Sequence, residues 1–376
     1  MYFFNSLFNM QIIYLLFLII KCSGSYLAIE YSKIMGSYQF NFYLGTPRQK
    51  LILSLDMTNN YTWVTNYLFK NRTSTTLKQI SYNSFILKYR WANLNALQYE
   101  DIASIYTNEE FKTINFPFIY VVNDTIEGNI FEGIGAAFKF TNEDCSLIHT
   151  LYRNGSISRK SFGFYPEKDN KGILYFGAIP DELLKDKYTY SIHVLNNYTT
   201  WNIHLKKVDN YTNRSPVRID SDEDFIKAPY SFIKYLRENP FKKYLDNQSC
   251  KYIPQDTGAQ GYFYCMCRNL TDFPDISFYI DKYEIKLDHN QLFESDMSTC
   301  FFSVVANLKD EWILGTLFLK NFITQFDYED EVIKIHSSTK YQIINDNNNA
   351  LVSIILVMIL SNIGSILLLI HKVFNI

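Results

Sequence analysis

The stretch Leu51–Val64 delivers one acid, Asp56, to the end of an apolar run. Leu51, Leu53 and Leu55 stand two residues apart, so they share one face of a predicted strand. The acid therefore leaves a buried strand, where an isolated charge is costly unless the side chain has a partner or a chemical role. This pattern makes Asp56 a candidate functional carboxylate.

A second stretch, Pro216–Ser221, repeats this design with a short apolar run that ends in Asp220. The two acids lie far apart in the chain. Their repetition is typical of a protein with two similar lobes, each of which contributes one carboxylate to a shared cleft.

The composition limits the class of protein. With 376 residues, of which 47% are hydrophobic, the chain is long enough for two domains with a large core and for appendages. Its formal charge is −2, and no basic cluster interleaves with aromatic residues. These features give no electrostatic reason to expect nucleic acid as a partner.

The acidic run Asp220–Asp224 resembles the start of a calcium-binding EF-hand loop. However, Phe225 stands where such a loop needs glycine, and Ser231 stands where it needs glutamate. We therefore expect no metal site and no cofactor. A solvated acidic turn is the simpler alternative for this run.

Several further segments occur in a fixed order around the two acids. They are Tyr38–Lys50, which contains a Gly-Thr-Pro turn, then Phe131–Gly135, Gly172–Gly177, Phe273–Phe278 and Trp312–Leu319. Together with the acids, this series resembles the pepsin-like aspartic proteases (family A1) over roughly residues 30 to 337.

The resemblance implies an all-β, bilobal pepsin-like fold with lobes at 25–190 and 191–337. It implies a polypeptide substrate or ligand, a monomer, and no cofactor. Asp56 and Asp220 would be the catalytic pair, which shares one proton and acts as base and acid toward a bound water. Tyr89, Trp63 and Ser221 would contact the substrate.

The sequence departs from the family around both acids. The family has Asp-Thr-Gly or Asp-Ser-Gly in each lobe, whereas this chain has Asp56-Met57-Thr58 and Asp220-Ser221-Asp222. Met57 lacks the hydroxyl that ties the two loops together. Thr58 and Asp222 replace glycine, so we expect backbone strain of about 1–3 kcal/mol at each.

Three functions therefore remain open. The chain is an active membrane-anchored aspartic endopeptidase, a peptide-binding pseudoprotease that has lost catalysis, or a surface glycoprotein built on the same scaffold. Inhibition by a transition-state mimic of peptide hydrolysis would identify the first. Peptide binding without turnover would identify the second.

The family's cleft-covering hairpin falls within Ser81–Ile105. Tyr89 fits the tyrosine that this hairpin normally carries, but no glycine stands at the tip. A tight turn with positive φ would have to use Asn93 or Asn95. An ordinary surface hairpin is the alternative.

Cysteines and sequons favour a secretory protein. By position in the family, Cys267 pairs with Cys300, and Cys250 and Cys265 form a plausible local bridge. Cys22 would be removed with a signal peptide, so Cys145 would be left over. Zinc binding by Cys265-x-Cys267 is the rival, with a tighter spacing than usual. Candidate glycosylation sites are Asn71, Asn123, Asn154, Asn197, Asn210, Asn213, Asn247 and Asn269.

The two ends of the chain predict a type I membrane protein of the secretory pathway or cell surface. Residues 1–24 resemble a signal peptide, and 338–349 form a polar stalk. Ala350–Ile370 is an uncharged stretch of 21 residues, long enough to span a bilayer, and 371–376 would be a cytoplasmic tail with Lys372. A lipid-anchor signal with attachment at Ser337 or Ser338 is the alternative.

Overall fold

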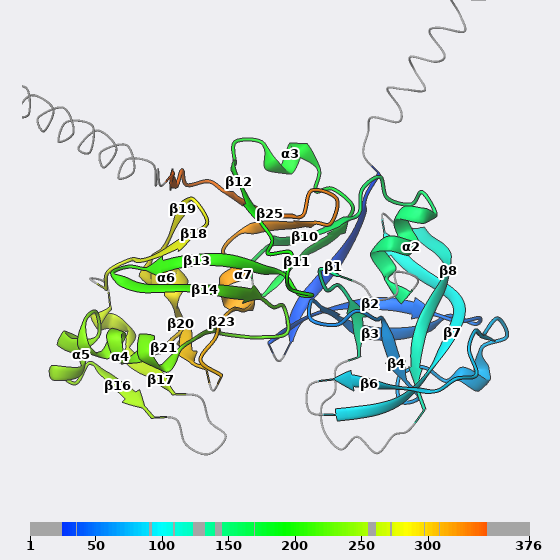
Figure 1. Ribbon diagram of the computed structural model, residues 1–376, viewed down its shortest axis with the longest axis horizontal. Coiled ribbons are helices and arrows are strands. Elements are labelled where there is room, and N and C mark those ends of the chain that lie inside the picture. The colour runs from blue at the N-terminus through cyan, green and yellow to red at the C-terminus, as the bar shows by residue number, and fades with distance from the viewer. Residues whose placement is uncertain are drawn as a thin grey trace, which may run out of the picture.

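The computed structural model describes residues 25–34, 36–89, 92–107, 110–122, 132–139, 145–168, 170–254, 261–270, 273–296, 298–307 and 309–343. Figure 1 shows two bodies of strands on either side of a central group of strands that includes β1, β10 and β11. The described part of the chain is mostly β, with two large sheets, as expected for a bilobal pepsin-like fold.

The largest sheet described has fourteen strands and joins the first body to the centre. Its order is β12 (Tyr188–His193), β25 (Val332–Ser337), β24 (Ile323–Asp327), β10 (Ser161–Pro166), β11 (Lys171–Phe176), β1 (Leu27–Ile34), β2 (Ser37–Leu44), β3 (Gln49–Asp56), β9 (Gly133–Gly135), β4 (Trp63–Thr65), β8 (Glu110–Val121), β7 (Ala92–Thr107) and β5 (Lys78–Gln79), with β6 (Phe85–Tyr89) paired to β7.

The second body contains an eight-stranded and a four-stranded sheet among its described residues. The eight-stranded sheet has the order β22 (Val304–Ala306), β15 (Ile226–Ala228), β23 (Trp312–Leu314), β14 (Tyr211–Ile219), β13 (Asn202–Val208), β18 (Ile276–Ile280), β19 (Tyr283–Leu287) and β26 (Gln342–Ile343). The four-stranded sheet has the order β16 (Cys250–Ile253), β17 (Tyr262–Met266), β21 (Thr299–Phe302) and β20 (Phe293–Asp296).

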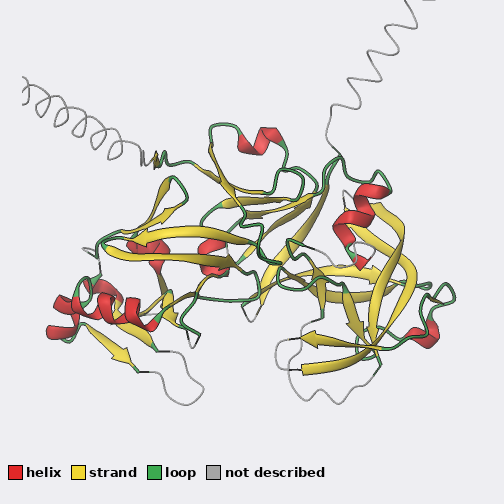
Figure 2. Cartoon of the chain, viewed as in Figure 1, coloured by secondary structure: helices red, strands yellow, loops and turns green. Residues whose placement is uncertain are grey.

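Helices are short and lie outside the sheets (Figure 2). Among the described residues they are α2 (Leu147–Arg153), α3 (Asp181–Leu184), α4 (Tyr230–Glu238), α5 (Lys242–Asp246), α6 (His289–Leu292) and α7 (Thr316–Leu319), with 3₁₀ turns η1 (Asn71–Thr73) and η3 (Cys267–Asn269).

The same strand arrangement occurs once in each body. In the first, β3 pairs with β9 in parallel, β9 with β4 antiparallel, and β4 with β8 in parallel. In the second, β14, β23, β15 and β22 repeat these three pairings with the same directions. Asp56 ends β3 and Asp220 directly follows β14, so the two acids occupy equivalent positions in a repeated substructure.

A glycine on each short partner strand, or directly after it, permits close packing of the acid-bearing loop. A Cβ on Gly135 would lie 2.6 Å from backbone atoms of Tyr61. A Cβ on Gly315, just after β23, would lie closer still to the carbonyl oxygens of Glu223 and Phe225. Real Cβ atoms do not approach other atoms this closely, so any larger residue at either position would displace the loop that follows the acid.

Trp201 links the strands that carry the two acids. Its indole Nε1 donates to the carbonyl oxygen of Ala136 at 2.7 Å, and the amide of Ala136 donates to the carbonyl of Asp56 at 2.8 Å. The carbonyl of Trp201 accepts from the amide of Ile219, next to Asp220, at 2.9 Å. One buried residue, through its side chain and its backbone carbonyl, therefore contributes to the position of both acid loops.

Two disulfides stabilise the second body. Cys250–Cys265 joins β16 to β17, and Cys267–Cys300 joins the end of β17 to β21, so both predicted pairings are confirmed. Cys145 is buried outside these bridges, and the Gln98 amide donates to its sulphur at 3.3 Å. The pairing rules out zinc ligation by the thiolates of Cys265 and Cys267.

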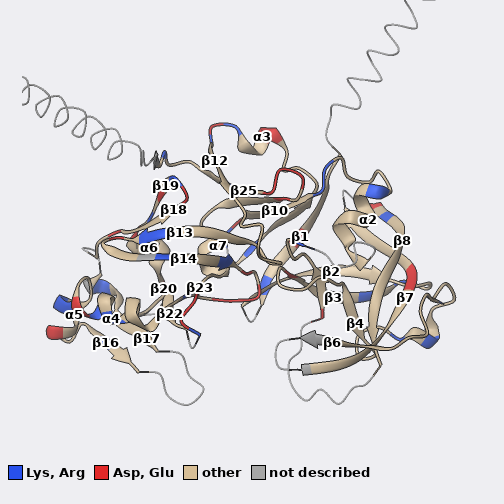
Figure 3. Cartoon of the chain, viewed as in Figure 1, with Lys and Arg blue, Asp and Glu red and all other residues tan. Residues whose placement is uncertain are grey.

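The predicted signal peptide and the predicted membrane span, 350–370, both lie outside the described residues. Within the part that the structure describes, no helix has the length and apolar character needed to cross a bilayer. Figure 3 shows that acidic and basic side chains are distributed over both bodies.

Replacing either packed glycine with alanine should destabilise the protein. We expect Gly135→Ala and Gly315→Ala each to lower the free energy of unfolding by about 1–3 kcal/mol, because each adds a methyl group where the loop backbone already lies. Urea denaturation would measure this.

Gly155→Ala serves as a control, because φ there is +68° but no atom lies within 4 Å of the added Cβ. It should cost only the left-handed backbone penalty of about 1 kcal/mol. Equal losses in all three variants would contradict the close packing described for Gly135 and Gly315.

Candidate active site

Asp56 is held by the loop that follows it. The residue is 1% exposed, and its Oδ1 accepts hydrogen bonds from Thr58 N at 2.9 Å, Thr58 Oγ1 at 2.7 Å and Asn59 N at 3.1 Å. Hydrogen bonds to a carboxylate oxygen stabilise its charged form and fix its orientation. Thr58 therefore contributes a hydroxyl to the acid directly.

The expectation of backbone strain at the two positions where the family has glycine is wrong. Neither Thr58 nor Asp222 has a positive φ, so neither occupies the left-handed region that favours glycine. Both backbone amides instead point at the acid two residues earlier, since Thr58 N donates to Asp56 and Asp222 N donates to Asp220 at 3.0 Å. An ordinary turn backbone is sufficient for this contact.

Asp220 has a different environment. Its Oδ1 accepts from the amide of Asp222, and its Oδ2 lies 3.3 Å from Nη2 of Arg218. The pKa of Asp220 is raised from 3.8 to about 6, and burial is the largest cause. The charge of Arg218 and the amide of Asp222 lower the pKa, whereas the charges of Glu223 and Asp56 contribute to the rise. The proton affinity of Asp220 thus depends on the charge of Asp56 in the other body.

One hydrogen bond joins the two acid loops directly. Ser221 Oγ donates to the carbonyl oxygen of Leu55, and Ser221 is 0% exposed. Met57 is also fully buried and, lacking a hydroxyl, packs in the hydrophobic core. The family resemblance implies that a hydroxyl residue after each acid ties the two loops together. This chain has such a hydroxyl only at Ser221, and its hydrogen bond is present.

The acidic run after Asp220 is paired and is not a freely solvated turn. Asp222 accepts from Ser37 Oγ at 3.0 Å, Glu223 forms an ion pair with Lys227, and Asp224 forms one with Lys33. Ser37 begins β2 and Lys33 lies on β1 of the large sheet. Two contacts therefore anchor the Asp220 loop to the start of the described chain.

The predicted hairpin exists, with a different turn. Tyr89 pairs with Ala92 at its tip, whereas Asn93 and Asn95 lie within β7 opposite Lys88 and Ile86. The prediction that one of these asparagines makes a turn with positive φ is therefore wrong. Residues 90–91 lie outside the described residues, and the structure describes only the backbone of Tyr89.

Trp63 is fully buried beneath this hairpin. It packs in a cluster with Leu87, Leu94 and Ile119, so it supports the hairpin from below. Ser221 is likewise fully buried against the other acid loop. In this structure neither side chain is open to a ligand.

Arg218 and Trp201 were missed by sequence reasoning. Strand alternation could have indicated Arg218, because a residue two positions before Asp220 leaves the same face of β14. No local pattern indicates the role of Trp201, since its partners lie on β14 and after β9.

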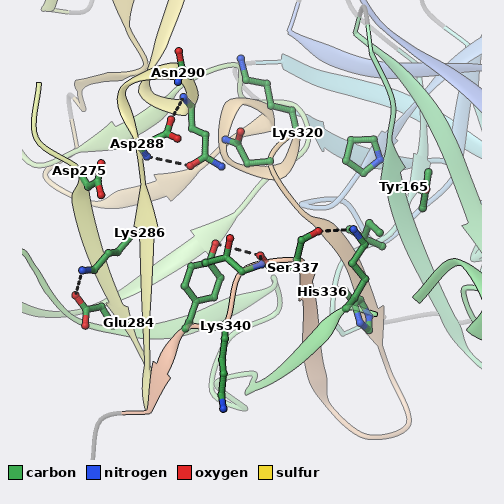
Figure 4. A pocket seen from close by; sticks show the side chains of 18 residues that line it. Tyr165, Asp275, Glu284, Lys286, Asp288, Asn290, Lys320, His336, Ser337 and Lys340 are labelled. Carbon is green, nitrogen blue, oxygen red and sulfur yellow. Dashed lines mark hydrogen bonds and ion pairs between the residues drawn. The ribbon is translucent and has the colours of Figure 1, made fainter. Parts of the chain in front are cut away.

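A cavity of about 740 Å³ lies elsewhere, between β10, β19, α6, α7 and the end of β25, and neither acid lines it. Figure 4 shows that the three labelled lysines do not converge: Lys286 turns to Glu284, and Lys320 and Lys340 point in opposite directions. We therefore assign no anion site there, and the acid pair remains the candidate active site.

Comparison with known proteins identifies the family of the chain. The family model described as eukaryotic aspartyl protease matches residues 37–338, a range that contains both acids. Gastricsin of Mus musculus is 20% identical over 327 residues, covering 78% of this chain and 78% of gastricsin. Mucorpepsin of Rhizomucor pusillus is 22% identical over 346 residues, covering 78% and 77%. Plasmepsin I of Plasmodium falciparum is 26% identical over 197 residues, covering 50% and 40%.

The raised pKa of Asp220 predicts how stability depends on pH. Its folded pKa of about 6 exceeds 3.8, so between these values the folded state binds more protons than the unfolded state. The free energy of unfolding should therefore fall as pH rises through this window. The contribution of Asp220 should be about 2–3 kcal/mol.

The variant Asp220→Asn should lack this dependence. The unfolding free energy of Asp220→Asn minus that of the unmodified protein should therefore increase by about 2–3 kcal/mol as the pH rises from 4 to 7. Urea midpoints across this range measure the gain, with Asp275→Asn, at an exposed position, as the control. Parallel curves for Asp220→Asn and the unmodified protein would show that Asp220 is not the buried titrating group.

Proposed function

The chain belongs to the eukaryotic aspartyl protease family, and we propose that it is an acid-dependent endopeptidase in which Asp56 and Asp220 carry out catalysis. The observation that carries this proposal is the coupling of two buried carboxylates, one from each repeat. The charge of Asp56 raises the pKa of Asp220, and Ser221 ties their loops together. Two such acids hold one proton between them over a range of acidic pH.

The reaction follows from one ionised and one protonated carboxyl. The ionised carboxylate takes a proton from a water while the water oxygen bonds to the scissile carbonyl carbon. The protonated carboxyl gives its proton to the carbonyl oxygen, which produces a tetrahedral diol. The carboxyl that received the proton of the water then gives it to the leaving nitrogen, while the other carboxylate takes a proton from a hydroxyl of the diol. The C–N bond breaks, which releases a carboxylic acid and an amine and returns the pair to one protonated and one ionised carboxyl.

The substrate class is a polypeptide. We assign Tyr89 to the hairpin that closes over it, because the tyrosine lies at the tip of the β6–β7 pair. Trp63 would act from beneath by supporting that hairpin.

Peptide binding without turnover is the second candidate. Two observations favour it: Met57 provides no loop-tying hydroxyl, and Arg218 places a positive charge against Asp220. Both weaken the conditions for a shared proton. Turnover, and not binding, therefore distinguishes the two functions.

We expect the purified protein to cleave an internally quenched peptide between pH 3 and pH 6. Asp56→Asn should reduce the rate by at least about 10³-fold, since it removes one of the two acid–base groups. Asp275→Asn, an exposed matched change, should retain the rate. A peptide in which a hydroxyl-bearing carbon replaces the scissile carbonyl should inhibit the reaction.

Tight binding of that mimic by the unmodified protein, with no cleavage at any pH, would support the peptide-binding alternative. Absence of both binding and cleavage would contradict a functional cleft of either kind.

Membrane anchoring is a separate proposal that rests on sequence. The uncharged stretch 350–370, followed by Lys372, supports a single span with the two lobes on the lumenal side. The two disulfides support the same side, because the secretory lumen is oxidising.

Protease treatment of sealed microsomes should leave the lobes intact until detergent is added. Carbonate extraction should leave the protein in the membrane, whereas a variant that ends at residue 349 should be released. Digestion of the lobes in sealed vesicles would contradict this topology.

A further inference from the structure

Arg218 lies on β14 two residues before Asp220, which directly follows this strand, so both side chains leave the chain on the same side. Val217 and Ile219, on the opposite face, are fully buried in the core. The guanidinium reaches Oδ2 of Asp220 at 3.3 Å, with 27% of the Arg218 side chain exposed against 4% of Asp220. The ion pair is therefore shielded from water on its acidic side.

The two oxygens of Asp220 have different donors. The amide of Asp222 donates to Oδ1, and Arg218 faces Oδ2. A proton on Asp220 would therefore reside on Oδ2, because Oδ1 already accepts. A protonated Oδ2 has lost its negative charge, so it is a poorer hydrogen-bond acceptor for the guanidinium. Protonation of Asp220 and its pairing with Arg218 thus oppose each other.

The other charged groups near Asp220 have the opposite effect or are engaged elsewhere. Asp56 from β3 and Glu223 from the following loop both favour the protonated form of Asp220. Glu223 itself pairs with Lys227. Among the described residues, Arg218 is the cation that forms an ion pair with Asp220, and it favours the ionised form.

We propose that Arg218 is a positioning residue that controls when the acid pair takes up its shared proton and so confines hydrolysis to more acidic conditions. The guanidinium holds Asp220 ionised until the medium supplies enough protons to displace it from Oδ2. The effect of Arg218 on hydrolysis rests on the proposed function, whereas its effect on the protonation of Asp220 is independent of that function.

The test is a series of substitutions that separates charge from shape. Arg218→Met removes the charge, Arg218→Gln keeps an N–H donor without charge, and Arg218→Lys keeps the charge without the planar fork. Arg214→Met removes the same charge from an exposed position on β14, about 13 Å away along the strand. It is the matched control.

The first measurement is the titration of Asp220 by carboxyl-carbon NMR in protein labelled at aspartate, assigned with Asp220→Asn. Arg218→Met and Arg218→Gln should raise the pH midpoint by about one to two units. Arg218→Lys and Arg214→Met should move it by much less. An unchanged midpoint in Arg218→Met would overturn the proposal, as would an equal shift in Arg214→Met.

The second measurement is the pH profile of peptide cleavage. The high-pH limb should move upward by as much as the titration midpoint of Asp220, giving about five- to tenfold more activity one pH unit above the original limb. A shifted titration of Asp220 with no cleavage by any variant would support the role of Arg218 and overturn the proposal that the protein is an endopeptidase. Cleavage by all variants with an unmoved limb would support the endopeptidase and overturn the role of Arg218.

Discussion

The hydrogen bond from Ser221 Oγ to the carbonyl of Leu55 is the contact on which the candidate site depends. The two acids arise from separate sheets, and a charge on one can influence the other only if their loops are held together. Trp201 supports the same junction from below through Ala136 and Ile219. A net hydrogen bond contributes only about 1 kcal/mol, but breaking this one would leave a buried carbonyl unsatisfied. Separating the two loops would therefore cost more than the hydrogen bond itself contributes.

The second body places a dense group of acids beside Asp220, and the structure compensates for each. Lys227, Lys33 and Ser37 engage the three that follow Asp220, two of them from the large sheet. Without these partners, mutual repulsion would open the loop and raise the proton affinity of the whole group. Pairing keeps the run compact, and the charges that act on Asp220 are those of Arg218, Glu223 and Asp56.

The strands that carry the acids were predictable because alternation is local: Leu51, Leu53 and Leu55 are all buried in β3. The pair Cys267–Cys300 followed from position in the family pattern, and Cys250–Cys265 followed as a local bridge between the cysteines that remained nearby. The hydroxyl of Thr58 was misjudged, because replacing a glycine was assumed to introduce strain, whereas the backbone there is ordinary. The contact between Lys33 and Asp224 could not be predicted, since it joins residues far apart in sequence and depends on how two sheets meet.

Strand order has a consequence for how the protein is made. β10 and β12 lie near each other in the chain, yet β24 and β25 separate them in the large sheet. During synthesis, both strands emerge from the ribosome long before residues 323–337 exist. Until then β10 presents an unpaired edge, which is a template for association with other chains. A ribosome that stalls before the last strands would thus release a chain with an open sheet edge, and quality control in the compartment where it folds must protect that edge until translation ends.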